Sequence, residues 1–335
     1  MKTQMTRALV TGATGFIGSR AVDVLCARGV AVRALCRHPF GNGTGSNGVQ
    51  HVHGDVTRPE TLPDAVAGCD VVFHCAWGGT TLAEARRVNV DGTRNVIEAA
   101  AAAGVRRIVH LSSMAVHGTV RGPELTEEAP LVARGDAYSV SKAEGERMAF
   151  DLGRERGLEV VALRPSLVYG PGSPFWLVEY FERVRDEHVT LVGGGAGLAN
   201  LVFVDDVVDA MLAAAIAPVA GVACLVSGET PVTWATYLGA FARMCRKPPP
   251  RRVPLWRAGL EMQILRVYGA LAQRPRRLRA ADVRLMGQAT AVRIDRARRL
   301  LSWSPATSFE AGMAICESWL RREGYLPPVP AGARR

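Results

Sequence analysis

The stretch Arg7-Ala-Leu-Val-Thr-Gly-Ala-Thr-Gly-Phe-Ile-Gly18 combines a short apolar segment, a glycine-rich turn and the start of a helical pattern. The apolar segment predicts a strand over Ala8–Thr11, and the pattern after the turn predicts a helix from about Phe16 to Arg28. A second apolar segment, Val30 to Cys36, follows at the distance typical of a βαβ unit. The stretch therefore predicts an α/β fold that begins with a nucleotide-binding turn.

The three glycines of this turn have separate physical roles. Gly12 permits a tight turn, Gly15 lets the backbone approach a phosphate, and Gly18 allows the helix to pack closely on the strand. The free N–H groups and the positive dipole end of the helix suit a pyrophosphate. The candidate cofactor-binding residues of the turn are Gly12, Thr14, Gly15, Phe16, Ile17 and Gly18.

Strand and helix patterns alternate over the first 165 residues, which predicts a doubly wound parallel sheet. The predicted strands are Ala8–Thr11, Ala31–Cys36, Gln50–His53, Val71–Cys75, Arg107–Leu111 and Glu159–Arg164. The predicted helices are Phe16–Arg28, Ala83–Ala103, Ala137–Arg156, Pro174–Glu187, Asp205–Ala217, Trp234–Met244 and Phe309–Glu323. The segment from Gly41 to Gly48 is predicted to be a flexible loop, because it consists of Gly, Asn, Ser and Thr.

Tyr138 and Lys142 lie four residues apart in the predicted helix Ala137–Arg156, so they share one face of it. A free phenol has a pKa of about 10 and needs help to exchange a proton near neutral pH. The positive charge of Lys142 is expected to lower the pKa of Tyr138 toward that range. Ser113 follows the predicted strand Arg107–Leu111 and can hydrogen-bond the same substrate oxygen. These three residues are the predicted catalytic set.

Together these features resemble the extended short-chain dehydrogenase/reductase superfamily, and the resemblance covers nearly the whole chain. Its nucleotide motif Thr-Gly-x-x-Gly-x-x-Gly corresponds to Thr11–Gly18, and its catalytic residues correspond to Ser113, Tyr138 and Lys142. Other segments match its landmarks in order: Asp55-Val56, His74-Cys75-Ala76, Asn89-Val90-Asp91-Gly92-Thr93, Arg164–Pro171 and Val204-Asp205-Asp206-Val207. Fold-level likeness of this kind predicts a superfamily without naming a substrate.

The resemblance implies a domain arrangement, further cofactor contacts and an oligomer. The Rossmann domain is expected at residues 1–165 plus about 199–228, the substrate-binding domain at 166–198 and 229–327, and a tail at 328–335. The implied additional cofactor-binding residues are Asp55, Val56, Cys75, Ala76, Tyr138, Lys142, Pro165 and Val168. A homodimer is expected through the helices Ala83–Ala103 and Ala137–Arg156.

The end of the second strand predicts NADP as the cofactor, with NAD as the less favoured alternative. Relatives that select NAD often carry an aspartate where this chain has Cys36, and an acid there binds the ribose hydroxyls. Arg37 follows directly, and a guanidinium pairs well with a 2′-phosphate. Arg33 and His38 are possible helpers.

Three classes of function compete: a carbonyl reductase or alcohol dehydrogenase, a nucleotide-sugar epimerase or dehydratase, and a non-catalytic nucleotide sensor. Sensors of this superfamily commonly lose the tyrosine or the lysine, and this chain keeps both. Sugar 4,6-dehydratases carry an Asp-Glu pair where this chain has Met114-Ala115, which cannot transfer a proton. Dehydration is therefore excluded, and a reductase and an epimerase remain.

Two positions favour the reductase over the epimerase or 4-ketoreductase of a nucleotide sugar. Nucleotide-sugar enzymes often have an asparagine where this chain has Leu167, and an arginine for the diphosphate where it has Ala199, next to Asn200. Apolar side chains there suit a less polar substrate. His117 replaces the usual tyrosine and is expected either to line the pocket or to pack. We expect an NADPH-dependent reductase of a largely apolar ketone or aldehyde.

The segment after Pro248 resembles the 3β-hydroxysteroid dehydrogenase and dihydroflavonol reductase branches. Its apolar stripe consists of Trp256, Leu260, Ile264, Val267 and Leu271, broadened by Leu255, Met262 and Leu265. Such a stripe is most often core, but it could also cover an apolar substrate or contact a membrane surface. The segment 243–299 carries sixteen Lys and Arg residues against three acids, although the whole chain has a net charge of only +10. No nucleic-acid motif accompanies it, so no nucleic-acid partner is expected.

Bulk properties fit a globular enzyme. The chain has 335 residues, of which 48% are hydrophobic, and no apolar run reaches membrane-spanning length. The first strand starts too early to leave room for a signal peptide. Seven cysteines without metal-ligand spacing predict reduced thiols in the cytoplasm and no metal site.

Overall fold

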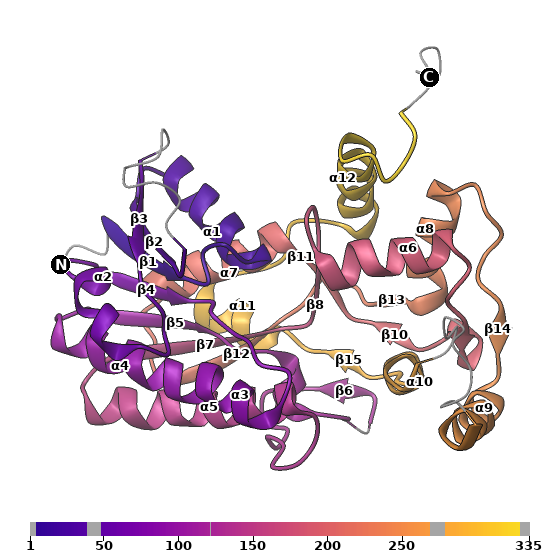
Figure 1. Cartoon of the computed structure of the whole chain (residues 1–335), viewed down its shortest axis with the longest axis horizontal. Helices are drawn as coiled ribbons and strands as arrows, with labels where there is room; N and C mark the ends of the chain where they lie inside the picture. The colour runs from indigo at the N-terminus through magenta and orange to yellow at the C-terminus, as the bar shows by residue number, and fades with distance from the viewer. Residues whose placement is uncertain (1–4, 39–47, 121, 269–278, 329–335) are drawn as a thin grey trace.

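The computed structural model describes residues 5–38, 48–120, 122–268 and 279–328. Its central feature is a seven-stranded parallel sheet (Figure 1). Across the sheet the strands are β12 (Val222–Val226), β7 (Glu159–Pro165), β5 (Arg107–Leu111), β4 (Val71–His74), β1 (Arg7–Thr11), β2 (Ala31–Cys36) and β3 (Val49–His53). The predicted doubly wound Rossmann sheet is confirmed, and each predicted strand has both ends within one residue of the observed ones.

The strand order reverses beside β1, because β2 lies on one side of it and β4 on the other. At such a reversal the chain leaves neighbouring strands toward opposite faces, which opens a crevice beyond their carboxyl ends. The glycine turn follows β1 at this point. The fold therefore directs the candidate cofactor residues to the edge where ligands of doubly wound sheets bind.

Helices cover both faces of the sheet, and each face has its own core. Ala8 and Val10 of β1 belong to the core shared with α1 (Phe16–Ala27) and α7 (Val204–Ile216). Leu9 belongs to the opposite core. The helices of that second face are α2 (Pro63–Val66), α4 (Gly92–Ala102) and α5 (Ala137–Glu155). Alternate side chains of one strand thus enter different cores, which explains why the strands are apolar throughout.

The predicted helix Ala83–Ala103 is interrupted. The structure has α3 (Leu82–Arg86), a π-helical turn at Arg87–Asp91 and then α4. At this turn the backbone of Asn89 approaches α5 so closely that a Cβ on Gly145 would lie 2.2 Å from the Asn89 oxygen. Single π-turns within helices are often found at functional sites.

Strand β12 was not predicted. It is a five-residue apolar run that pairs in parallel with β7, from Val222 opposite Val161 to Val226 opposite Pro165. It follows α7 after a turn at Gly221, whose φ is +69°. A five-residue apolar run can be strand or buried helix, so its pattern alone does not identify it.

The second half of the chain forms short strand pairs and helices beside the sheet (Figure 1). The strand pairs are β8 (Leu167–Tyr169) with β11 (Leu201–Phe203), β9 (Leu191–Val192) with β14 (Arg252–Val253), β10 (Leu198–Ala199) with β13 (Val232–Thr233), and β6 (Glu124–Leu125) with β15 (Ala291–Val292). The helices are α6 (Tyr180–Arg185), α8 (Trp234–Met244), α9 (Leu255–Tyr268), α10 (Ala280–Met286), α11 (Asp295–Leu301) and α12 (Phe309–Arg322). Of the predicted Pro174–Glu187 helix, Pro174–Glu179 is a π-helical turn and only the rest is α6.

Some predictions fall outside the described residues: nearly all of the loop Gly41–Gly48, Leu271 of the apolar stripe, and the tail beyond residue 328. Among the residues that are described, no helix is long and apolar enough to cross a bilayer.

Candidate active site

The glycine turn forms a cradle that only glycines allow. Gly12 has φ of +64°, and the N–H of Gly15 donates to the Gly12 oxygen at 2.9 Å. A Cβ on Gly18 would lie 2.1 Å from that same oxygen, and one on Gly12 would lie 2.8 Å from the nitrogen of Ala76. Gly15 is the N-cap of α1 and has no side chain to occupy the helix's first N–H groups. These groups can therefore receive a phosphate, so the residues present fit a dinucleotide.

A cavity of about 520 Å³ borders this cradle on the side of α12. Gly15 and Phe16 line it from the turn, and Trp319 and Arg322 line it from α12. One wall is an ion pair in which Arg20 donates to Asp205 at 2.6 and 2.9 Å. The cradle is thus open beside the last helix.

A buried chain of hydrogen bonds fixes the end of β4 beside the cradle. The Ala76 N–H donates to Thr11 Oγ1 at 3.2 Å, and Thr11 Oγ1 lies 2.8 Å from His74 Nδ1. His74 Nε2 lies 2.9 Å from Thr93 Oγ1, whose hydroxyl donates to the Asn89 oxygen at 2.8 Å. Because Thr93 uses its only proton there, it must accept from Nε2–H of His74, and Nδ1 then accepts from Thr11. His74 is therefore neutral, and burial lowers its pKa to about 3.

The predicted catalytic residues come together from two neighbouring elements. Ser113 follows β5 and caps the short turn Met114–His117, accepting from the N–H of Ala115 at 3.1 Å. Tyr138 lies in the first turn of α5 and is hydrogen-bonded to Ser113. Lys142, one turn further, is buried and donates from Nζ to the Leu111 oxygen at 2.5 Å.

The pKa of Tyr138 differs from expectation. Burial raises the pKa of Tyr138, the hydrogen bond from Ser113 opposes this, and Asp136 adds to the rise. The net pKa of Tyr138 is therefore raised and not lowered, because burial of the phenol outweighs the effects that favour its ionised form. Burial lowers the pKa of Lys142 to about 8. A phenol that keeps its proton is suited to donate it to a carbonyl oxygen.

A buried ion pair supports Lys142 from the next helical turn. Arg164 at the end of β7 donates to both oxygens of Glu146, at 3.0 and 2.5 Å, and both side chains are buried. Arg164 also donates to His117 Nε2 at 3.0 Å, which leaves the proton of the neutral ring on Nδ1, facing the Pro130 oxygen. His117 therefore connects the Ser113 turn to α5. Burial and the adjacent Arg164 lower the pKa of His117.

The predicted phosphate-binding end of β2 is exposed. Cys36 is buried, whereas Arg37 and His38 are exposed. Arg33 faces elsewhere: it donates to the Asp64 oxygen at 2.5 Å and to Gln50 at 3.0 Å, so it is not available as a helper. The pKa of Asp55 is lowered. Burial opposes this shift, but hydrogen bonds from Thr57 and the nearby positive charge of Arg37 outweigh the burial.

The remaining predicted cofactor residues lie at the same edge of the sheet. Val56 is buried, and its oxygen accepts from Asn95 at 2.9 Å. Cys75 and Ala76 follow β4 directly, and burial raises the pKa of the Cys75 thiol to about 12. Pro165 ends β7, and Val168 is buried in β8.

The two positions that argue against a nucleotide sugar are apolar and buried. Leu167 lies in β8 and Ala199 in β10. Asn200 is occupied by backbone: it donates to the Thr290 oxygen at 2.9 Å and accepts from the Val292 N–H at 3.1 Å. Leu167 and Ala199 have no donor for a diphosphate, and the Asn200 amide is buried and bonded to backbone groups.

Two aromatic residues near Tyr138, Trp77 and Phe175, carry no signal in the sequence pattern. The ring of Trp77 meets that of Tyr138 edge to face, with centroids 5.5 Å apart, and Phe175 lies 6.5 Å beyond Trp77. Trp77 and Phe175 are 53% and 51% exposed. Both lie in loops or irregular turns, where no periodic pattern marks them.

Among the described residues, no group of three His, Cys, Asp or Glu side chains could hold a metal ion.

A model of the NAD dependent epimerase/dehydratase family matches residues 8–224. The chain is 30% identical over 333 residues to the 4-hydroxy-2-methyl-3-oxo-4-farnesyl-3,4-dihydroquinoline-1-oxide ketoreductase of Stigmatella aurantiaca, covering 96% of this chain and 99% of that protein. It is 32% identical over 273 residues to the 2-alkyl-3-oxoalkanoate reductase of Shewanella oneidensis, covering 75% and 69% respectively.

Among solved structures, MoeE5 in complex with UDP-glucuronic acid and NAD superposes with a TM-score of 0.75 at 28% identity, covering 95% of this chain and 99% of that one. The sequence relatives named above are reductases, whereas this structural neighbour holds a nucleotide sugar.

Proposed function

The chain belongs to the NAD-dependent epimerase/dehydratase family, and we propose that within this family it is an NADPH-dependent reductase of a largely apolar ketone or aldehyde. The observation that carries the proposal is the surface around Tyr138. Trp77 packs against the phenol and Phe175 packs against Trp77, and Leu167 and Ala199 replace polar contacts that a nucleotide sugar would use. Aromatic and aliphatic walls favour an apolar substrate.

Each residue has a proposed role. When bound, the nicotinamide cofactor supplies the hydride that reduces the carbonyl carbon. Tyr138 donates its proton to the carbonyl oxygen, and Ser113 donates a hydrogen bond to the same oxygen. Lys142 binds the cofactor's ribose and places a positive charge near the phenol, which favours the phenolate left after proton transfer. The pair Arg164–Glu146 holds α5 and the Ser113 turn in register.

The relatives support a carbonyl substrate. The names of two of them describe reduction of a 3-oxo group on molecules with alkyl or farnesyl substituents. For this chain we infer substrates of the same chemical type. A suitable panel contains 2-alkyl-3-oxoalkanoates and ketones of steroid and flavonoid type.

The alternative is an epimerase or 4-ketoreductase of a nucleotide sugar, and the likeness to MoeE5 is the observation in its favour. Binding of UDP and dTDP to the NADPH-saturated protein distinguishes the two. Each missing charge-assisted contact forfeits about 1.5–3 kcal/mol. Calorimetric titration should therefore give dissociation constants in the millimolar range or worse.

Micromolar binding of UDP or dTDP outside the cofactor site would favour the sugar enzyme. Three described arginines of the basic segment 243–299 already form ion pairs: Arg279 with Glu179, Arg296 with Glu128 and Arg298 with Glu229. Loss of that binding in a variant of one of these arginines would contradict the apolar-substrate proposal directly.

NADP is the proposed cofactor, because Arg37 is exposed at the end of β2 and Cys36 cannot accept ribose hydroxyl protons as a carboxylate does. Arg37→Ala should weaken NADPH binding by about 1.5–3 kcal/mol, the scale of a hydrogen bond to a charged group. NADH binding should barely change, since NADH has no 2′-phosphate. Calorimetry of both cofactors with both proteins measures this. Tighter binding of NADH than of NADPH by the unmodified protein would refute the assignment.

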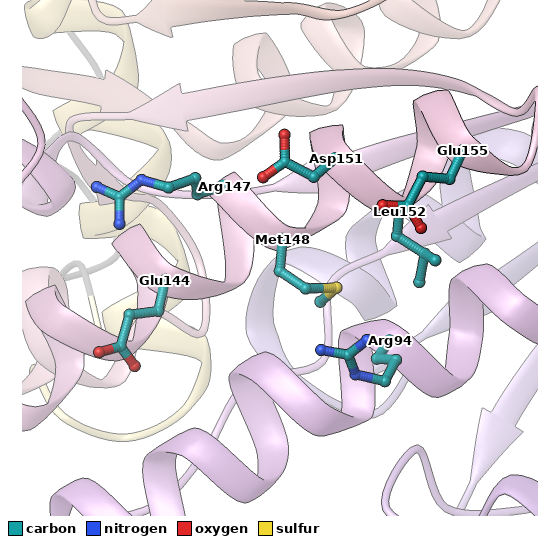
Figure 2. A pocket seen from close by; sticks show the side chains of 7 residues that line it. All are labelled: Arg94, Glu144, Arg147, Met148, Asp151, Leu152 and Glu155. Carbon is teal, nitrogen blue, oxygen red and sulfur yellow. The ribbon is translucent and has the colours of Figure 1, made fainter.

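We further propose the two-domain division 1–165 with about 199–228, against 166–198 with 229–327, and a homodimer through residues 83–103 and 137–156, which contain most of α3, α4 and α5. A hollow of about 350 Å³ lies between α4 and α5. Figure 2 shows the side chains that line it. Its rim carries both signs of charge: Arg94 and Arg147 lie with Glu144, Asp151 and Glu155. A two-fold arrangement can pair opposite charges across such a face. Sedimentation as a monomer at all accessible concentrations would contradict the dimer.

A cytoplasmic location is also proposed. All seven cysteines are free in the structure, and five of them are buried with no partner thiol. Free thiols persist in a reducing compartment. Detection of the protein only in an oxidising compartment would contradict this.

A further inference from the structure

Three large apolar side chains are exposed together at the start of α9. Leu255 is 49% exposed, Trp256 72% and Leu260 54%. We call these three residues the α9 patch. Figure 1 shows α9 at the opposite end of the molecule from the seven-stranded sheet. The patch is therefore separate from the candidate active site.

The helical geometry shows that this exposure is one-sided. Successive residues of an α-helix are rotated by about 100°, so Leu255, Trp256 and Leu260 fall within one face. Ala258 points the other way and is fully buried, and α9 packs against α10. Single exposed apolar residues are ordinary, but a tryptophan and two leucines on one helical face mark an interaction surface.

The surroundings of the α9 patch are basic. Arg251 and Arg252 are exposed and are separated from the start of α9 only by Val253 and Pro254, and Arg284 is exposed on α10, the helix that packs against α9. In the described part of the chain, none of these three arginines forms an ion pair with a carboxylate. Among residues 255–261 of α9, the acidic side chain is Glu261, and it forms an ion pair with Arg257 at 3.1 Å. The patch therefore has free positive charge beside it.

We propose that the α9 patch docks this protein on an anionic lipid surface. Trp256, Leu255 and Leu260 enter the boundary between headgroups and acyl chains, where an amphipathic tryptophan ring is well accommodated. Arg251, Arg252 and Arg284 contact the acidic headgroups, and each such cation adds electrostatic attraction near the surface. Apolar insertion and positive charge together provide the two signals that a peripheral contact needs.

A second copy of the chain fits this surface less well. A two-fold contact centred on the α9 patch would bring the unpaired arginines of one copy close to those of the other. Like charges at close range repel, whereas an anionic surface attracts all of them at once. The positive charge beside the α9 patch therefore favours an anionic lipid surface over a second copy of the chain.

The experiment is flotation of the full-length protein with two kinds of vesicle: phosphatidylcholine alone, and phosphatidylcholine with phosphatidylglycerol in equal parts. The test variant is Trp256→Ser/Leu260→Ser, whose changes lie on the surface and should leave the melting temperature unchanged. The matched control is Ile216→Ser, which removes an equally exposed apolar side chain at the end of α7. A third variant, Arg251→Gln/Arg252→Gln, removes charge and keeps the apolar side chains.

The unmodified protein and the Ile216→Ser control should float with the phosphatidylglycerol vesicles and bind phosphatidylcholine much more weakly. The Trp256→Ser/Leu260→Ser variant should bind at least about tenfold less. The arginine variant should lose the preference for phosphatidylglycerol. No flotation of the unmodified protein, or flotation unaffected by the Trp256 and Leu260 changes, would overturn the proposal. Self-association that disappears in the Trp256→Ser/Leu260→Ser variant would overturn it in favour of a chain–chain contact.

Discussion

Replacing Tyr138 with phenylalanine is expected to lower turnover by at least about 10²-fold, the contribution of a positioned general acid. The phenol is hydrogen-bonded to Ser113 and its pKa is raised by burial, so it keeps the proton that the reaction needs. Cofactor affinity should change little, because the glycine cradle and Arg37 remain. Steady-state kinetics on an authentic substrate, with a separate cofactor titration, measures both quantities.

Tyr237→Phe is the matched control, since it removes a phenolic hydroxyl that is buried without a hydrogen-bond partner among the described residues. Its turnover should equal that of the unmodified protein. Near-normal turnover of Tyr138→Phe, or an equal loss in both variants, would contradict the proton-donor role.

Stability should fall between pH 7 and pH 5, because three buried histidines stay neutral in the folded protein. Burial lowers the pKa of His74 to about 3, and burial also lowers the pKa values of His110 and His117. A depressed folded-state pKa contributes stability that is present above the unfolded value of about 6.5 and is lost as the pH falls below it. His74 alone should cost about 2 kcal/mol over this interval. Urea unfolding at both pH values measures the loss.

His110→Leu separates this effect from other titrations. Neither ring nitrogen of His110 has a partner among the described residues, and its ring lies 5.4 Å from that of His74. A leucine of similar volume should therefore cost little at pH 7 and should reduce the loss at pH 5. An unchanged loss in the variant would show that His110 does not contribute.

Regular elements could be predicted from the sequence because their periodicity is local. The six predicted strands of the sheet and the helices around α1, α5, α7, α8 and α12 end within one residue of the observed bounds. The glycine turn and the spacing of Tyr138 and Lys142 are equally local. Strand β12 could not be predicted, because a continuous apolar run of five residues shows neither the alternation of a strand nor the periodicity of a helix.

Contacts between residues that are far apart in the sequence could not be predicted. The Arg164–Glu146 pair and the place of Trp77 beside Tyr138 arise only when β7, α5 and the loop after β4 come together. The spacing of Tyr138 and Lys142 predicts a lowered pKa of Tyr138, because it accounts only for the charge of Lys142. In the folded protein the burial of the phenol outweighs it. The separation of two residues along a helix predicts that they are neighbours, but it does not predict how far burial will shift the pKa of either one.

The most direct test of the central proposal is NADPH oxidation by the purified protein in the presence of the apolar ketone panel and, separately, of UDP-sugars. Turnover is expected with at least one 2-alkyl-3-oxoalkanoate, steroid or flavonoid ketone, and none is expected with a UDP-sugar. Epimerisation or oxidation of a UDP-sugar, with no NADPH oxidation by any apolar ketone, would contradict the proposal.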